Sequence, residues 1–145
     1  MRPLAALFAL LAALAAAEPA LAQQKPGDPG TNVEMPFLIA PLSVDGRLYG
    51  YAYISLKVVT ATQSAALDVR DKVAFVQDAF VRDVNASSIG KAGDPKTVDQ
   101  PALVARLLAD TRRVIGAAKI VNIVLIDVQI SPIRPGEAVA SSPSG

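Results

Sequence analysis

The chain contains no cysteine and no histidine among its 145 residues. Without cysteine it can form no disulfide, carries no thiol nucleophile and cannot be anchored by a lipid on an N-terminal cysteine, so the burial of apolar side chains must stabilise the fold. The two absences together exclude Cys-rich and His-containing zinc sites and Ser-His-Asp triads. These absences argue against most enzymes, and we expect a protein without catalytic residues, metal or cofactor.

The chain also lacks a clear excess of positive or negative charge. Fourteen basic residues stand against thirteen acidic ones, which gives a formal net charge of +1. Proteins that bind nucleic acid or acidic membrane surfaces usually carry a strong basic excess on one face. We therefore do not expect nucleic acid to be a partner.

Only one long hydrophobic run occurs, and it lies at the start of the chain. Arg2 precedes an apolar run over residues 4–17, and Glu18-Pro19 and the small-x-small sequence Ala20-Leu21-Ala22 follow. This is the pattern of a cleavable secretory signal, and the run is shorter than the roughly 20 residues that span a bilayer. We expect export, on composition into a bacterial periplasm, with cleavage before Gln23. The alternative is a retained signal that anchors the protein to the membrane.

The rest of the chain divides into three parts. Residues 23–34 are polar and rich in proline and glycine, which predicts a flexible linker. Residues 134–145 have a similar composition and are expected to form a disordered tail. The predicted folded domain therefore covers residues 35–133.

The first half of this domain has the pattern of a β-hairpin. Residues 37–44 predict an edge strand, because Pro36 and Pro41 cannot donate backbone hydrogen bonds. Asp45-Gly46 is a strong turn signal, and residues 47–59 predict the returning strand. Alternation places one set of its side chains toward the core, namely Leu48, Ala52, Ile54, Leu56 and Val58. The opposite face carries a stripe of tyrosines, Tyr49, Tyr51 and Tyr53, that either faces solvent or forms a contact surface.

Two helices and a strand are expected to follow. Residues 62–85 predict one long helix whose buried stripe is Ala66, Val69, Val73, Val76, Phe80 and Val84. Its solvated side carries the i,i+4 pairs Asp68–Lys72 and Asp78–Arg82. After a turn-rich segment over residues 85–98, Asp99 is expected to cap a second helix that Gly116 ends, with Leu103, Leu107, Thr111 and Val114 or Ile115 buried.

The last predicted element is a strand over residues 120–130, which is almost continuously apolar and β-branched. Such runs are typical of the central strand of a sheet. The order of elements is β-β-α-α-β. We therefore predict an α+β fold, a small β-sheet with two helices packed on one face.

Asp127 is the only acidic residue inside this apolar strand. One interpretation is a buried carboxyl with a raised pKa that acts as a general acid. The other, which we favour, is a residue on the open sheet face or at the strand end, paired with Lys57 or Arg47. A single carboxylate without a second acid or a metal supports little hydrolytic chemistry.

Three side chains of the first helix lie away from its buried stripe. At about 100° per residue, Phe75 and Val81 fall outside the stripe, and Ala74 lies near Val81. A group of apolar side chains on the outer half of a helix indicates a second contact surface. The alternative is a wide core face that the tail or the linker covers.

The pattern of these elements resembles one known family, the periplasmic domain of the flagellar basal-body protein FliL, whose fold is related to the stomatin-like (SPFH, band 7) domains. The resemblance covers residues 36–129. It depends on Arg47-Leu48-Tyr49 with Ile54-Ser55-Leu56-Lys57-Val58, on Val69-Arg70-Asp71-Lys72-Val73, on residues 103–112, and on a last strand that ends Asp127-Val128-Gln129.

The resemblance implies a protein without enzymatic activity, a homo-oligomeric ring or partial ring, and association with the stator of the flagellar motor. The chain departs from the family in one respect, because members usually keep a transmembrane helix where this chain has a cleavable signal. The leading hypothesis is a self-associating periplasmic interaction domain. The alternatives are a small periplasmic ligand-binding or carrier protein with a pocket between sheet and helices, and a hydrolase built on Asp127.

Overall fold

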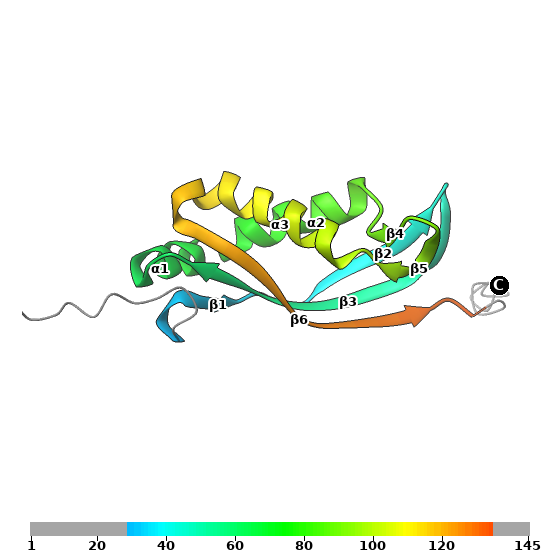
Figure 1. Cartoon of the computed structure of the whole chain (residues 1–145), viewed down its shortest axis with the longest axis horizontal. Coiled ribbons are helices and arrows are strands. Elements are labelled where there is room, and N and C mark those ends of the chain that lie inside the picture. Colours follow the sequence, from blue (N-terminus) through cyan, green and yellow to red (C-terminus); the bar gives the residue numbers. More distant parts are fainter. Residues whose placement is uncertain (1–28, 135–145) are drawn as a thin grey trace, which may run out of the picture.

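The computed structural model describes residues 29–134, and the predicted signal, the first half of the predicted linker and all but the first residue of the predicted tail lie outside them. The fold is α+β, with an antiparallel four-stranded sheet and helices on one of its faces (Figure 1). Within this part of the chain no helix is both long and apolar enough to cross a membrane. The helices are α1 (Gln63–Asp71), α2 (Val73–Ala86) and α3 (Gln100–Ile115). The sheet strands are β1 (Asn32–Glu34), β2 (Leu38–Val44), β3 (Arg47–Thr60) and β6 (Ile120–Pro132).

The hairpin of β2 and β3 forms where the sequence predicts it. Asp45 and Gly46 both have positive φ angles, 51° and 75°, as a type I′ turn requires. Strand β2 pairs with β3 and with no other described strand, so its predicted edge position is confirmed. Among residues other than glycine, Asn and Asp adopt positive φ angles most readily, which accounts for Asp45 at the first turn position.

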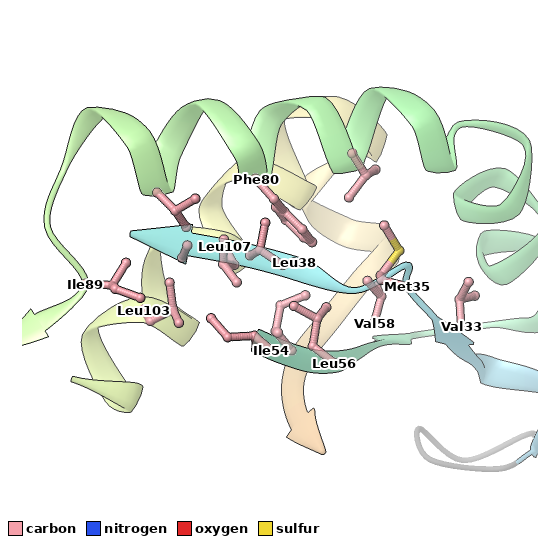
Figure 2. Packing of buried hydrophobic residues seen from close by; sticks show 14 of the residues in the cluster. Val33, Met35, Leu38, Ile54, Leu56, Val58, Phe80, Ile89, Leu103 and Leu107 are labelled. Carbon is pink, nitrogen blue, oxygen red and sulfur yellow. The ribbon is translucent and has the colours of Figure 1, made fainter. Parts of the chain in front are cut away.

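The core fills the space between the sheet and helices α2 and α3. Phe80 points from α2 toward the sheet, and its side chain is completely buried (Figure 2). The predicted stripe of the first helical segment is buried or packed against the core at every position. On α3 the buried residues include Leu103, Leu107, Thr111 and Ile115, and the side chain of Asp99 caps its first turn by accepting from the N–H of Ala102. The helix phases derived from the sequence are therefore correct.

The first helical segment is two helices, which corrects the prediction of a single helix over residues 62–85. Lys72 separates α1 from α2 with φ −111° and ψ 17°, outside the helical region. Its N–H still reaches back into α1, to the carbonyls of Asp68 and Val69, and its carbonyl accepts from Phe75 and Val76. Because Lys72 makes backbone hydrogen bonds to both helices, the break needs neither proline nor glycine and leaves no mark in the sequence.

Strand β6 lies at the edge of the sheet, so the prediction of a central position is wrong. Strands β1 and β2 both pair with one side of β3, and β6 pairs with the other side along almost its whole length. The central strand is β3, whose inward residues Ile54, Leu56 and Val58 are fully buried. An apolar run resembles a central strand in composition, but composition does not determine which strands pair with it.

The second half of the predicted linker is folded, which corrects the prediction that all of it is flexible. Strand β1 lies inside the predicted linker over residues 23–34, and Val33 is 5% exposed. The short helix η1 (Pro29–Thr31) precedes it, and the hydroxyl of Thr60 donates to the carbonyl of Thr31 at 2.8 Å. Pairing with β3 orders this segment, which is too short to show a strand pattern of its own.

Two further details differ from prediction. Leu48 is exposed, because a β-bulge lies between the pairs Leu42–Gly50 and Ser43–Leu48 and moves Leu48 off the core face. The turn-rich segment after α2 contains a second hairpin, β4 (Gly90–Lys91) with β5 (Asp94–Val98), whose flanking Ile89 is buried. A two-residue strand is below the length at which alternation can be detected.

Candidate interaction surface

The three apolar residues singled out on the first helical segment are all exposed and all lie on α2. Phe75 is 68% exposed and Val81 is 42% exposed, and Ala74 is exposed as well. Neither the predicted linker nor the predicted tail covers them within residues 29–134. Phe75 is thus a large apolar side chain in solvent, on a helix whose opposite side holds the fully buried Phe80.

These residues do not form one continuous patch. Val81 follows Phe75 by six positions, which places the two about 120° apart around the helix. Phe75 lies on the side of α2 that faces α3, where it lines a groove, and neither Val81 nor Ala74 lines that groove. The structure thus separates the predicted surface into a groove side with Phe75 and a second side with Ala74 and Val81.

The groove runs between α2 and α3 on the side away from the sheet and has a volume of about 700 Å³. Apolar side chains from both helices line it, Phe75 and Ala79 from α2 and Val114 from α3. Charged side chains of both signs complete its walls: Lys72, Asp78, Arg82, Asp83, Asp110 and Arg113. A groove with an exposed aromatic residue and charges of both signs is suited to a protein surface rather than to a small apolar ligand.

Among residues 29–134, Asp110 is the one buried acid, and the sequence patterns above do not single it out. Its side chain is only 8% exposed, and it forms an ion pair with Arg113 through Oδ1, while Oδ2 has no hydrogen-bond partner. Burial raises the pKa of the Asp110 carboxyl above its ordinary value, the nearby Asp83 adds to the rise, and Arg113 opposes it. A signal was present, because position 110 lies three residues after Leu107 on the stripe that α3 buries.

Arg106 fixes the two helices relative to each other at the end of the groove. Its guanidinium donates to Oδ2 of Asp83 at 2.6 and 2.9 Å. The same group donates to the carbonyls of Asp83, Ser87 and Ser88 at the C-terminal end of α2. A planar donor fork can satisfy several final carbonyls of a helix at once, so Arg106 both caps α2 and attaches it to α3.

Asp127 is exposed on the open face of the sheet, opposite Ser55 of β3. Its carboxylate accepts a hydrogen bond from Nε2 of Gln129 at 2.8 Å, and it makes no ion pair with Lys57 or Arg47. The buried general acid is therefore contradicted, and the open-face interpretation is correct except for the partner. Of the predicted helix pairs, Asp78–Arg82 forms at 2.5 Å, whereas Asp68 pairs with Lys119 instead of Lys72.

The face of the sheet opposite the helices also carries apolar side chains. Tyr51 and Tyr53 are about two-fifths exposed there, and Ile39, opposite Tyr53, is 52% exposed. Tyr51 and Tyr53 of the predicted stripe thus face solvent in a single copy of the chain, as one of its two predicted interpretations requires, whereas Tyr49 is only partly exposed. No group of acidic residues that could hold a metal ion occurs in the part of the chain that the structure describes.

Comparison with models of protein families gives no match, and comparison with curated proteins gives none either. The resemblance to the FliL family therefore remains a prediction from the sequence pattern.

Proposed function

We propose that this chain is an exported, non-catalytic interaction domain that associates with copies of itself. The observation that carries the proposal is Phe75, a phenylalanine that is 68% exposed at the rim of the groove between α2 and α3. Aromatic residues with charged neighbours are typical of the energetic centres of protein interfaces. On the resemblance alone, we extend the proposal to a periplasmic location and to partners in the flagellar motor or basal body.

The alternative of a ligand-binding or carrier protein has less support. It requires a deep apolar pocket between the sheet and the helices. That space is filled by core side chains such as Phe80, Leu38 and Leu107 (Figure 2). The groove lies instead on the outer side of the helices and is open, with charged walls.

A charge at Phe75 tests the proposal. Phe75→Glu should leave the single copy folded, because a charge on a solvated helix position changes the free energy of unfolding by only about 0.5 kcal/mol. In an assembly that buries this position, a charge would replace an apolar contact and lose its water, so this contact should break and the mass of the assembly should fall. Thermal unfolding and light scattering on the same samples measure both effects.

Phe80→Ala is the matched control on the other side of the helix. It should lower the free energy of unfolding by about 3–5 kcal/mol, since it empties a buried aromatic site. Val81→Glu tests the other side of α2 separately, because Val81 lies outside the groove. If neither Phe75→Glu nor Val81→Glu changes the mass of the assembly, α2 is not the interface and the proposal loses its main support.

A further inference from the structure

Strand β6 leaves one of its two backbone edges without a strand partner among residues 29–134. Its other edge pairs with β3 from Ile120 to Pro132, and no further described strand joins it. Figure 1 shows the C-terminal half of β6, in orange, along the border of the sheet. An edge strand of this length offers a row of unpaired N–H and C=O groups to another extended chain.

Several apolar side chains along this edge are open to solvent. Ile126 is 54% exposed and Ile130 is 41% exposed. Val128 and Ile130 lie opposite the fully buried Ile54 and Ala52 of β3, so both point to the face of the sheet that the helices cover, yet neither is buried. The strand thus extends the core face of the sheet beyond the part that the helices shield.

We propose that β6 of a second copy of this chain pairs with this edge, antiparallel, about a two-fold axis at Val128. In this register the two Val128 side chains lie opposite each other, and Ile126 lies next to Ile130 of the second copy. Asp127 lies opposite Gln129 of the second copy. This inference rests on the self-association proposed above. It adds a second interface, on β6, that is separate from the one on α2.

The order of residues in β6 favours a second copy as the occupant. Asp127 is the only charged residue of the strand, and the proposed register places an amide opposite it. Within one copy Gln129 already donates to Asp127 at 2.8 Å, so the two side chains match chemically. A register centred on Asp127 would instead bring two carboxylates together, which is unfavourable for residues directly opposite each other. Pro132, which has no N–H to donate, limits the ladder at its end.

A single cysteine tests this geometry directly, because the chain has none of its own. Residues directly opposite in an antiparallel pair have Cβ atoms about 4.5–5.5 Å apart, close to the spacing of a disulfide. Val128→Cys, alone in the full chain, can form a disulfide only between two copies. Mild oxidation should convert most of this variant to a covalent dimer on a non-reducing gel.

Ile130→Cys and Val121→Cys are matched controls. Both native side chains are exposed to about the same extent, 41% and 39%, but in the proposed register neither lies opposite itself. They should give little covalent dimer under the same conditions. In sizing experiments, Ile130→Lys should weaken the dimer about tenfold or more, and Val121→Lys should not, because Val121 lies outside the paired segment.

The outcomes separate this inference from the proposed function. Cross-linking of Val128→Cys above both controls, with loss of the dimer in Ile130→Lys, supports the pairing. If the native chain assembles, Phe75→Glu dissociates it and Val128→Cys does not cross-link, the edge inference is overturned while the proposed function stands. If every variant and the native chain remain single copies, both are overturned, and the edge is either kept free or taken by another protein.

Discussion

At the scale of single residues, Asp110 is the group whose surroundings are least favourable to its charge. Its side chain is 8% exposed, and one of its carboxylate oxygens has no hydrogen-bond partner. Its partner Arg113 is 72% exposed, so solvent screens much of the attraction between the two. The raised pKa of Asp110 therefore reflects burial that its ion pair does not compensate.

The raised pKa of Asp110 makes the free energy of unfolding depend on pH. A carboxyl whose pKa is raised on folding binds more protons in the folded state, so its contribution to stability increases as the pH falls from the raised pKa toward the unfolded value of about 3.9. Asp110→Asn removes that contribution. The free energy of unfolding of this variant, relative to the native chain, should therefore be higher at pH 7 than at pH 4.

Urea unfolding at the two pH values measures the difference. Asp68→Asn is the matched control: its hydrogen bond with Lys119 lowers the pKa of the Asp68 carboxyl, so the effect of this substitution should stay nearly constant between pH 7 and pH 4. The stability that Asp68 contributes is present above about pH 3.9 and is lost as the pH falls through its lowered pKa. An Asp110→Asn difference that stays constant from pH 7 to pH 4 would show that Asp110 does not titrate in this way.

At the scale of elements, the attachment of α2 to α3 depends on Arg106. Arg106→Lys keeps the positive charge but loses the planar fork that contacts Asp83 and the final carbonyls of α2. Since the side chains of Arg106 and Asp83 are partly buried, 28% and 21% exposed, the free energy of unfolding should fall by about 2 kcal/mol.

Arg82→Lys is the control for this substitution. Its ion pair with Asp78 also lies on α2 but is exposed, with 79% and 55% of the two side chains in solvent. Such pairs contribute little, so the change should stay below about 0.5 kcal/mol. Equal effects of the two substitutions in urea unfolding would refute the role given to Arg106.

The elements also show which features of the fold the sequence alone can predict. The Asp45-Gly46 turn, the Asp99 cap and the burial of Phe80 follow from neighbours within a few residues, and all three are correct. The edge position of β6 depends on the pairing of strands far apart in the chain, which residue spacing does not encode. The folding of β1 into a strand also depends on long-range pairing, here with β3, which residue spacing does not encode.

The candidate site was predicted in part. The exposure of Phe75 and Val81 follows from helical spacing, but their separation becomes clear only once α3 forms the second wall of the groove. Asp110 shares the stripe of Leu103 and Leu107, yet its burial also depends on how closely α2 and α3 approach. Contacts between helices therefore mark the limit of prediction from the sequence at this site.

At the scale of the whole molecule, residues 29–134 leave several apolar surfaces open in a single copy. They include the groove side of α2 with Phe75, the edge of β6 with Ile130, and the face of the sheet with Tyr51 and Tyr53. A small domain without disulfides that leaves this much apolar surface in solvent is more consistent with assembly than with an isolated copy. Two separate interfaces per copy would also allow assemblies larger than a dimer.

Sedimentation velocity of the unmodified chain over a wide range of concentrations tests self-association most directly. Assembly through reversible interfaces makes the average mass depend on concentration by mass action. We expect the mass to rise from that of one copy, 15.0 kDa for the full chain, to at least two copies as the concentration increases. A mass of one copy across the whole range, from a sample shown to be folded, would contradict the central claim.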